Sequence, residues 1–158
     1  MRAGDLLLVA GGSDWQSRVI MVGTGSHWTH IAGQVETANG PMLAEATHTG
    51  IALAPLDKYQ HADTRWIDTH LTDAQRAAAC MFALSCVGQR YGFGQIAAIT
   101  ACWLSGKRWF FGREGSEDCA SYWGRCLEHA GVILATSPGL MRPADFAILF
   151  DVTPRLER

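Results

Sequence analysis

The chain has 158 residues, of which 48% are hydrophobic and 18% charged, a composition that excludes a disordered or fibrous protein. Thirteen Lys and Arg residues against fifteen Asp and Glu give a net charge of −2, which offers no bulk electrostatic attraction to nucleic acid. The length fits one domain over residues 1–158, built around one hydrophobic core.

The first half of the chain has the pattern of short strands. Asn39 and Gly40 lie between two apolar segments, and an Asn-Gly pair in that position favours a β-hairpin. Ser13 is a possible cap for a short helix over 13–22. Strands are expected over residues 5–10, 30–36, 42–47, 51–53 and 65–68.

The second half of the chain is mostly helical. Thr72 and Gln75 fit a capping box, which predicts the start of a helix that runs to residue 87. Further helices are expected over 96–104 and 117–130, and a last strand over 146–152. Strands followed by helices indicate an α+β fold, in which one antiparallel sheet is packed by a few helices.

The chain start and the cysteines bear on location. The first twelve residues contain one Arg and a run of about six apolar residues, which is shorter than the core of a signal peptide. Five cysteines, an odd number without a CxxC pair, favour a reducing compartment over a disulfide framework. We therefore expect a cytoplasmic protein, with phage association or a dedicated secretion machine as alternatives.

Cys119 is the candidate nucleophile. If Ser116 caps the helix that follows, Cys119 lies in its first turn, where free N–H groups and the helix dipole favour a thiolate. The same N–H groups are placed to stabilise an oxyanion. Cys126, two turns further on, is expected in the core. The alternative is that Cys119 is also only a packing residue.

His30 and Glu45 are the candidate partners of that thiol. His30 opens a strand directly after a loop of small residues, a common place for a site residue. Glu45 lies among apolar residues on the next strand, and a carboxylate there is costly unless it is paired, for example with an imidazole. The alternative is that Glu45 faces solvent. A zinc site using His27, His30 and a cysteine is a weaker option, because the His spacing suits a helix.

Several sequence motifs resemble a known family. In chain order they are GDLLL, TGSHWTHIAGQV, MLAEAT, YGFG and DCASYW, and the similarity runs roughly from Gly4 to Phe150. They resemble the circularly permuted branch of the NlpC-type papain-like cysteine amidases, the YiiX- and YaeF-like group, which is related to the lecithin:retinol acyltransferase-like enzymes. In that branch the His strand precedes the Cys helix, and the resemblance implies a papain-like fold.

The resemblance implies specific roles for residues of this chain. Cys119 would be the nucleophile, His30 the general base and acid, Glu45 the third polar member, and Tyr91 a residue lining the site. The chain departs from unpermuted relatives directly after the cysteine, where Ala120 and Ser121 replace a Ser-Gly pair.

The expected function is that of a cysteine amidase or peptidase without cofactor or metal. It would cleave a peptidoglycan-type peptide or a similar amide through a thioester. Trp28 and Trp109 are candidate substrate-binding residues, with a core position as the alternative. Two other functions remain open. One is a lipid-directed hydrolase or acyltransferase, in which the apolar segments 96–104 and 109–111 contact a membrane or acyl chain. The other is a catalytically inactive binding domain.

Overall fold

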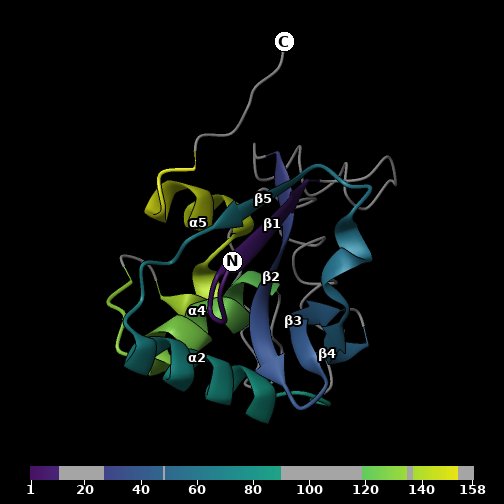
Figure 1. Ribbon diagram of the computed structural model, residues 1–158. Helices are drawn as coiled ribbons and strands as arrows, with labels where there is room; N and C mark the ends of the chain where they lie inside the picture. Colours follow the sequence, from purple (N-terminus) through teal and green to yellow (C-terminus); the bar gives the residue numbers. More distant parts are fainter. Residues whose placement is uncertain (11–26, 48, 90–118, 135–136, 153–158) are drawn as a thin grey trace.

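The computed structural model describes residues 1–10, 27–47, 49–89, 119–134 and 137–152. Five strands form one antiparallel sheet in the order β4-β3-β2-β1-β5 (Figure 1). The strands are β1 (Leu6–Ala10), β2 (Trp28–Thr37), β3 (Gly40–Thr47), β4 (Gly50–Ala54) and β5 (Thr64–Ile67). The expected antiparallel sheet, including the hairpin at Asn39 and Gly40, is confirmed.

The described helices cover one face of the sheet (Figure 1). They are α2 (Asp73–Ser85), α4 (Cys119–His129) and α5 (Pro143–Leu149), accompanied by the 3-10 turns η1 (Leu56–Tyr59) and η2 (Pro138–Leu140). The Thr72 side chain accepts from the Gln75 N–H, and the Gln75 side chain accepts from the Thr72 N–H, so the expected capping box begins α2. These elements confirm the α+β class.

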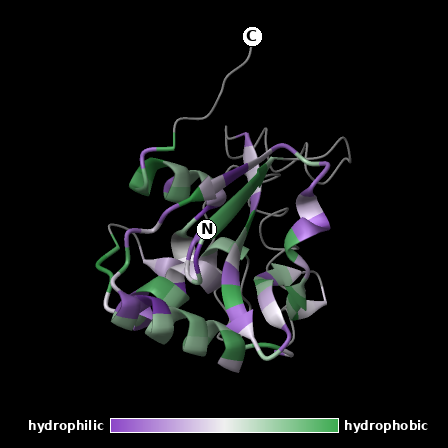
Figure 2. Cartoon of the chain, in the orientation of Figure 1, coloured by the Kyte–Doolittle hydropathy of each residue, from purple (hydrophilic) through white to green (hydrophobic). Residues whose placement is uncertain are grey.

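Both faces of the sheet are buried around β1, which is hydrophobic along its length (Figure 2). The main core lies between the sheet and the helices and includes Leu6, Leu8, Ile31, Trp123 and Phe146. The second core lies on the opposite face. It consists of Leu7, Val9, Ala32, Leu43 and Ala54, against which Leu56, Tyr59 and Trp66 pack.

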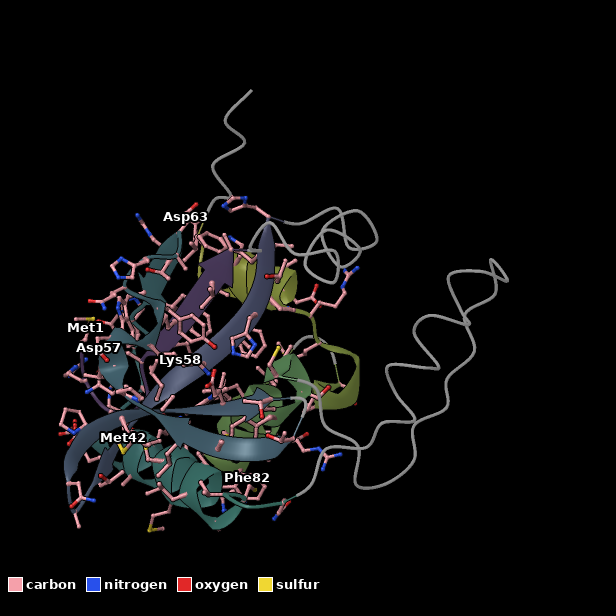
Figure 3. The ribbon with its side chains drawn as sticks, turned by 90° about the vertical axis from the view of Figure 1, so that its right-hand side faces the viewer. Met1, Met42, Asp57, Lys58, Asp63 and Phe82 are labelled. Carbon is pink, nitrogen blue, oxygen red and sulfur yellow. The ribbon has the colours of Figure 1, made fainter. Side chains whose placement is uncertain are left out.

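The strands β2 and β3 are paired only over part of their length. Their ladder runs from Thr37 and Gly40 to Gly33 and Ala44. Beyond Gly33, β2 stays paired with β1, and beyond Ala44, β3 stays paired with β4. Figure 3 shows β2 rising away from β3 and β4, with α4 at the opening. The sheet therefore opens between its second and third strands.

Trp123 of α4 lies where the opening begins. Its indole Nε1 donates to the carbonyl oxygen of Ala44 at 2.9 Å, and a β-carbon at Gly33 would overlap its ring. Glycine at position 33 thus lets a fully buried indole lie directly on the strand. This contact fixes the position of α4 along β2 and β3.

Arg76 attaches the start of the chain to α2. Its Nη1 donates to Asp5 Oδ1 at 2.6 Å and to the Ala3 carbonyl at 2.8 Å, and its Nε donates to the Leu71 carbonyl. Arg76 and Asp5 are both buried, so each charge depends on the other for compensation.

The last expected strand, over 146–152, is wrong. Pro143 and Asp145 begin α5 instead, because Pro suits the first position of a helix and the Asp145 carboxylate accepts from the Arg142 N–H at 2.7 Å. Phe146 is buried while Ile148 is exposed, so the apolar run is one face of a short helix. The helices expected over 13–22 and 96–104 lie outside the described residues.

Within the described ranges, no helix combines the length and the hydropathy needed to cross a membrane.

Candidate active site

His30 and Glu45 form a hydrogen-bonded pair at the opening of the sheet. His30 Nε2 lies 2.8 Å from Glu45 Oε2. Because side chains alternate along a strand, His30 shares a face with Ala32, and Glu45 shares one with Leu43, which places both on the side of the second core. Glu45 is only 1% exposed, so the pairing expected from the sequence is confirmed and the solvent-facing alternative is excluded.

Cys119 reaches this pair from the other side of the sheet. It is the first residue of α4, it is half-buried against the main core, and it lies close enough to His30 to raise the pKa of the imidazole. Since Cys119 and Trp123 are four residues apart, they lie on the same face of the helix. Trp123 lies against Gly33 and Ala44, and Cys119 lies one turn further towards the opening. The parted strands therefore let a thiol and an imidazole from opposite faces meet.

Two residues of η1 complete the surroundings of Glu45. Tyr59 donates its hydroxyl to Glu45 Oε2 at 2.5 Å, and the Lys58 ammonium forms an ion pair with Glu45 Oε1. The Tyr59 ring centroid lies 5.7 Å from that of His30. Both residues come from the turn that follows β4, and Figure 3 shows Lys58 over the sheet while its neighbour Asp57 lies at the outer edge.

The contacts set the charges of the pair. Burial lowers the pKa of His30, but the charge and hydrogen bond of Cys119, together with those of Glu45, outweigh burial and raise it to about 9. Burial raises the pKa of Glu45, but hydrogen bonds from His30, Lys58 and Tyr59 outweigh this and lower it to about 2. At neutral pH the site therefore holds a carboxylate and an imidazolium. A cation beside a thiol favours the thiolate.

The other residues singled out in the sequence lie elsewhere. Trp28 is 5% exposed and belongs to the main core, which is the alternative position given above, and a role in substrate binding is not supported by its burial. Tyr91 and Trp109 lie outside the described residues, as do the apolar segments 96–104 and 109–111. His27 Nε2 lies 2.7 Å from Asp63 Oδ2, so His27 and His30 bond to different carboxylates. Cys126 is fully buried, as expected.

Lys58 and Tyr59 were missed from the sequence. The segment Leu56–Tyr59 carries two charged residues between apolar ones, which is typical of a surface turn. A sequence signal is Pro55, which ends β4 and precedes η1. Since β4 is paired with β3, the strand that carries Glu45, a turn after β4 can reach the carboxylate. A turn that follows the neighbouring strand is a natural source of partners for a buried carboxylate.

The fold and the site together define an α+β protein that places a cysteine, a histidine and a glutamate side by side. No protein-family model and no curated protein matches the sequence. Among solved structures, the crystal structure of the metalloprotein YiiX from Escherichia coli O157:H7 is similar, with a TM-score of 0.65 and 18% sequence identity. The match covers 85% of this chain and 69% of YiiX. At this identity the similarity shows a YiiX-like fold.

Proposed function

We propose that the protein is a cysteine amidase or peptidase in which Cys119 is the nucleophile, His30 the base and acid, and Glu45 the residue that orients His30. The observation that carries the proposal is the central position of His30. One ring nitrogen, Nε2, bonds to Glu45, which leaves Nδ1 for the Cys119 thiol. This order of nucleophile, base and orienting group is what covalent catalysis by a thiol requires.

The reaction follows from these positions. The Cys119 thiolate attacks the carbonyl carbon, and N–H groups in the first turn of α4, which have no partner inside the helix, donate to the oxyanion. His30 gives its proton to the leaving nitrogen, the C–N bond breaks, and Cys119 is acylated. His30 then takes a proton from water, whose oxygen attacks the thioester. The C–S bond breaks, the acid leaves, and the Cys119 thiolate is restored beside the His30 imidazolium.

A peptidoglycan-type peptide is the first substrate to test, since the proposed chemistry is cleavage of an amide. Acyl esters test the lipid-directed alternative with the same nucleophile. In both classes the same nucleophile attacks a carbonyl carbon, and the leaving group is an amine or an alcohol, so one set of variants serves both assays.

YiiX is named a metalloprotein, which raises the question whether the residues of this site could bind a metal ion. Across the ranges that the structure describes, no group of three or more His, Cys, Asp and Glu side chains is suited to hold a metal ion. The Glu45 oxygens already accept from Lys58, Tyr59 and His30, and an ammonium occupies the place of a cation. These residues do not fit a metal, and the proposed steps use none.

The test begins with alkylation, which needs no substrate. Iodoacetamide is expected to label Cys119 at about pH 6.5 at least about tenfold faster than the other cysteines, because His30 favours its thiolate. Mass spectrometry identifies the labelled residue. His30→Ala is expected to remove the preference, and Cys119→Ala is expected to abolish cleavage of muropeptides or esters.

Cys126→Ala is the matched control, since Cys126 lies on the same helix but is fully buried. It is expected to keep the fast labelling and the cleavage, even if its stability falls. Equal, slow labelling of all cysteines would contradict the proposal, and so would cleavage by a folded Cys119→Ala variant.

A further inference from the structure

We propose that Lys58 and Tyr59 are positioning residues of the active site, which hold Glu45 ionised and oriented so that it in turn fixes His30. This inference rests on the proposed function, because it assigns a role within that site. Neither residue touches the reacting thiol in the proposed mechanism. They act on the carboxylate that lies behind the base.

The geometry divides the two oxygens of Glu45 between different partners. Oε2 accepts from His30 Nε2 at 2.8 Å and from the Tyr59 hydroxyl at 2.5 Å, while Oε1 is paired with the Lys58 ammonium. The last torsion of a glutamate side chain has a broad range, so one contact alone does not fix the carboxylate plane. Contacts on both oxygens fix the carboxylate plane, and this in turn fixes the direction of the hydrogen bond between Glu45 and His30.

Charge balance gives Lys58 a second role. Glu45 is 1% exposed, and a buried carboxylate is stable only with enough donors or a counter-charge. The mechanism proposed above uses Cys119 as a thiolate, so two negative groups, Cys119 and Glu45, face two positive ones, the His30 imidazolium and Lys58. The two pairs cancel. Without Lys58 the site carries a net negative charge, and the pKa of Glu45, which pairs directly with Lys58, is expected to rise.

Tyr59 anchors Lys58 and Glu45 to the second core. Its ring packs on the second core and lies 5.7 Å from the His30 ring, while the Lys58 ammonium lies 5.1 Å from the Tyr59 ring centroid. A cation at this distance from an aromatic ring is attracted to its face. The Lys58 side chain is 39% exposed, and Tyr59 and Glu45 together limit its motion.

The first experiment is a carbon-13 NMR titration of the Glu45 carboxyl in the full chain. Lys58→Met is expected to raise its titration midpoint by about one pH unit or more, because a neighbouring cation is lost. Lys58→Arg keeps the charge, so its Glu45 midpoint is expected to stay close to that of the natural sequence. Asp57→Asn is the control, since Asp57 is exposed on the same turn. It is expected to leave the midpoint unchanged.

The second experiment follows alkylation of Cys119 by iodoacetamide against pH. Lys58→Met and Tyr59→Phe are each expected to slow labelling at neutral pH by about threefold or more, with the rise in rate moved to higher pH. A purely structural role would change the amount of folded protein and leave this pH midpoint in place. Tyr59→Phe removes one oxygen atom, so it provides the test if Lys58→Met does not fold.

The outcomes separate this inference from the proposed function. If Cys119 labels selectively in the natural sequence but folded Lys58→Met and Tyr59→Phe keep the same profile, the positioning role is wrong and the proposed function stands. An unchanged Glu45 midpoint in folded Lys58→Met also overturns it. If Cys119 has no selective reactivity, the proposed function fails, and the NMR titration still decides whether Lys58 holds the Glu45 charge.

Discussion

Replacing Glu45 with Gln tests the electrostatics of the site most directly. The substitution keeps the shape of the side chain and removes one charge. His30, Lys58 and Tyr59 all donate to Glu45. A glutamine amide has one accepting oxygen and one donating nitrogen, so the new NH₂ group must face a donor while His30 is protonated. The variant therefore loses contacts that no rotation of the amide restores.

The size of the effect follows from the pKa of Glu45, which is lowered from 4.5 to about 2. One pKa unit corresponds to about 1.4 kcal/mol, so the ionised carboxylate contributes about 3 kcal/mol to the free energy of unfolding. Because the folded-state pKa is the lower one, this stability is fully present above pH 4.5 and is lost as the pH falls through about 2. Glu45→Gln is expected to be about 3 kcal/mol less stable near pH 6.

Urea denaturation of both proteins at several pH values measures this difference. The difference in the free energy of unfolding is expected to disappear as the pH falls below about 4, since the natural Glu45 side chain then becomes neutral too. Glu36→Gln is the control, because Glu36 is exposed on β2 and its loss is expected to change stability by less than about 0.5 kcal/mol. A gap that is absent at pH 6, or one that stays constant with pH, would refute the reasoning.

Three further substitutions test the fold around the site. Gly33→Ala is expected to cost about 3 kcal/mol or more and to slow labelling of Cys119, because a β-carbon there overlaps the Trp123 ring; an unchanged labelling rate would contradict this. Arg76→Met is expected to cost about 3–5 kcal/mol in urea denaturation, since Asp5 is left buried without its counter-charge, and a loss below about 1 kcal/mol would be inconsistent with that pair. Thr72→Ala removes the cap of α2 and is expected to lower the free energy of unfolding by about 1 kcal/mol, with no change in labelling.

Local signals in the sequence were enough to predict much of the sheet and the relation between His30 and Glu45. The hairpin at Asn39 and Gly40 makes β2 and β3 neighbours, and a carboxylate in an apolar strand needs a partner. A histidine on the facing strand was the nearest group able to supply one. The structure confirms this pairing at 2.8 Å.

Features that depend on distant contacts were not predictable in this way. The opening between β2 and β3 depends on Trp123, which lies about ninety residues from Gly33 in the chain. The role of Lys58 depends on the packing of η1 against β3, the strand that carries Glu45. Nothing in the sequence around Lys58 distinguishes it from a surface lysine. The last strand failed for the opposite reason. Pro143 and Asp145 are local helix-start residues, but the apolar run that follows them does not by itself distinguish a strand from one face of a short helix.

The proposed site is assembled from two parts that form at different stages of folding. His30, Glu45, Lys58 and Tyr59 lie within a short stretch built from neighbouring strands and one turn, so their contacts are local and form early. Cys119 joins only when α4 docks on the opened sheet, and during synthesis that helix emerges after all five strands. The proposed site therefore predicts that reactivity of the thiol reports completion of the fold, and that an unfinished chain has no activated cysteine that would react with its surroundings.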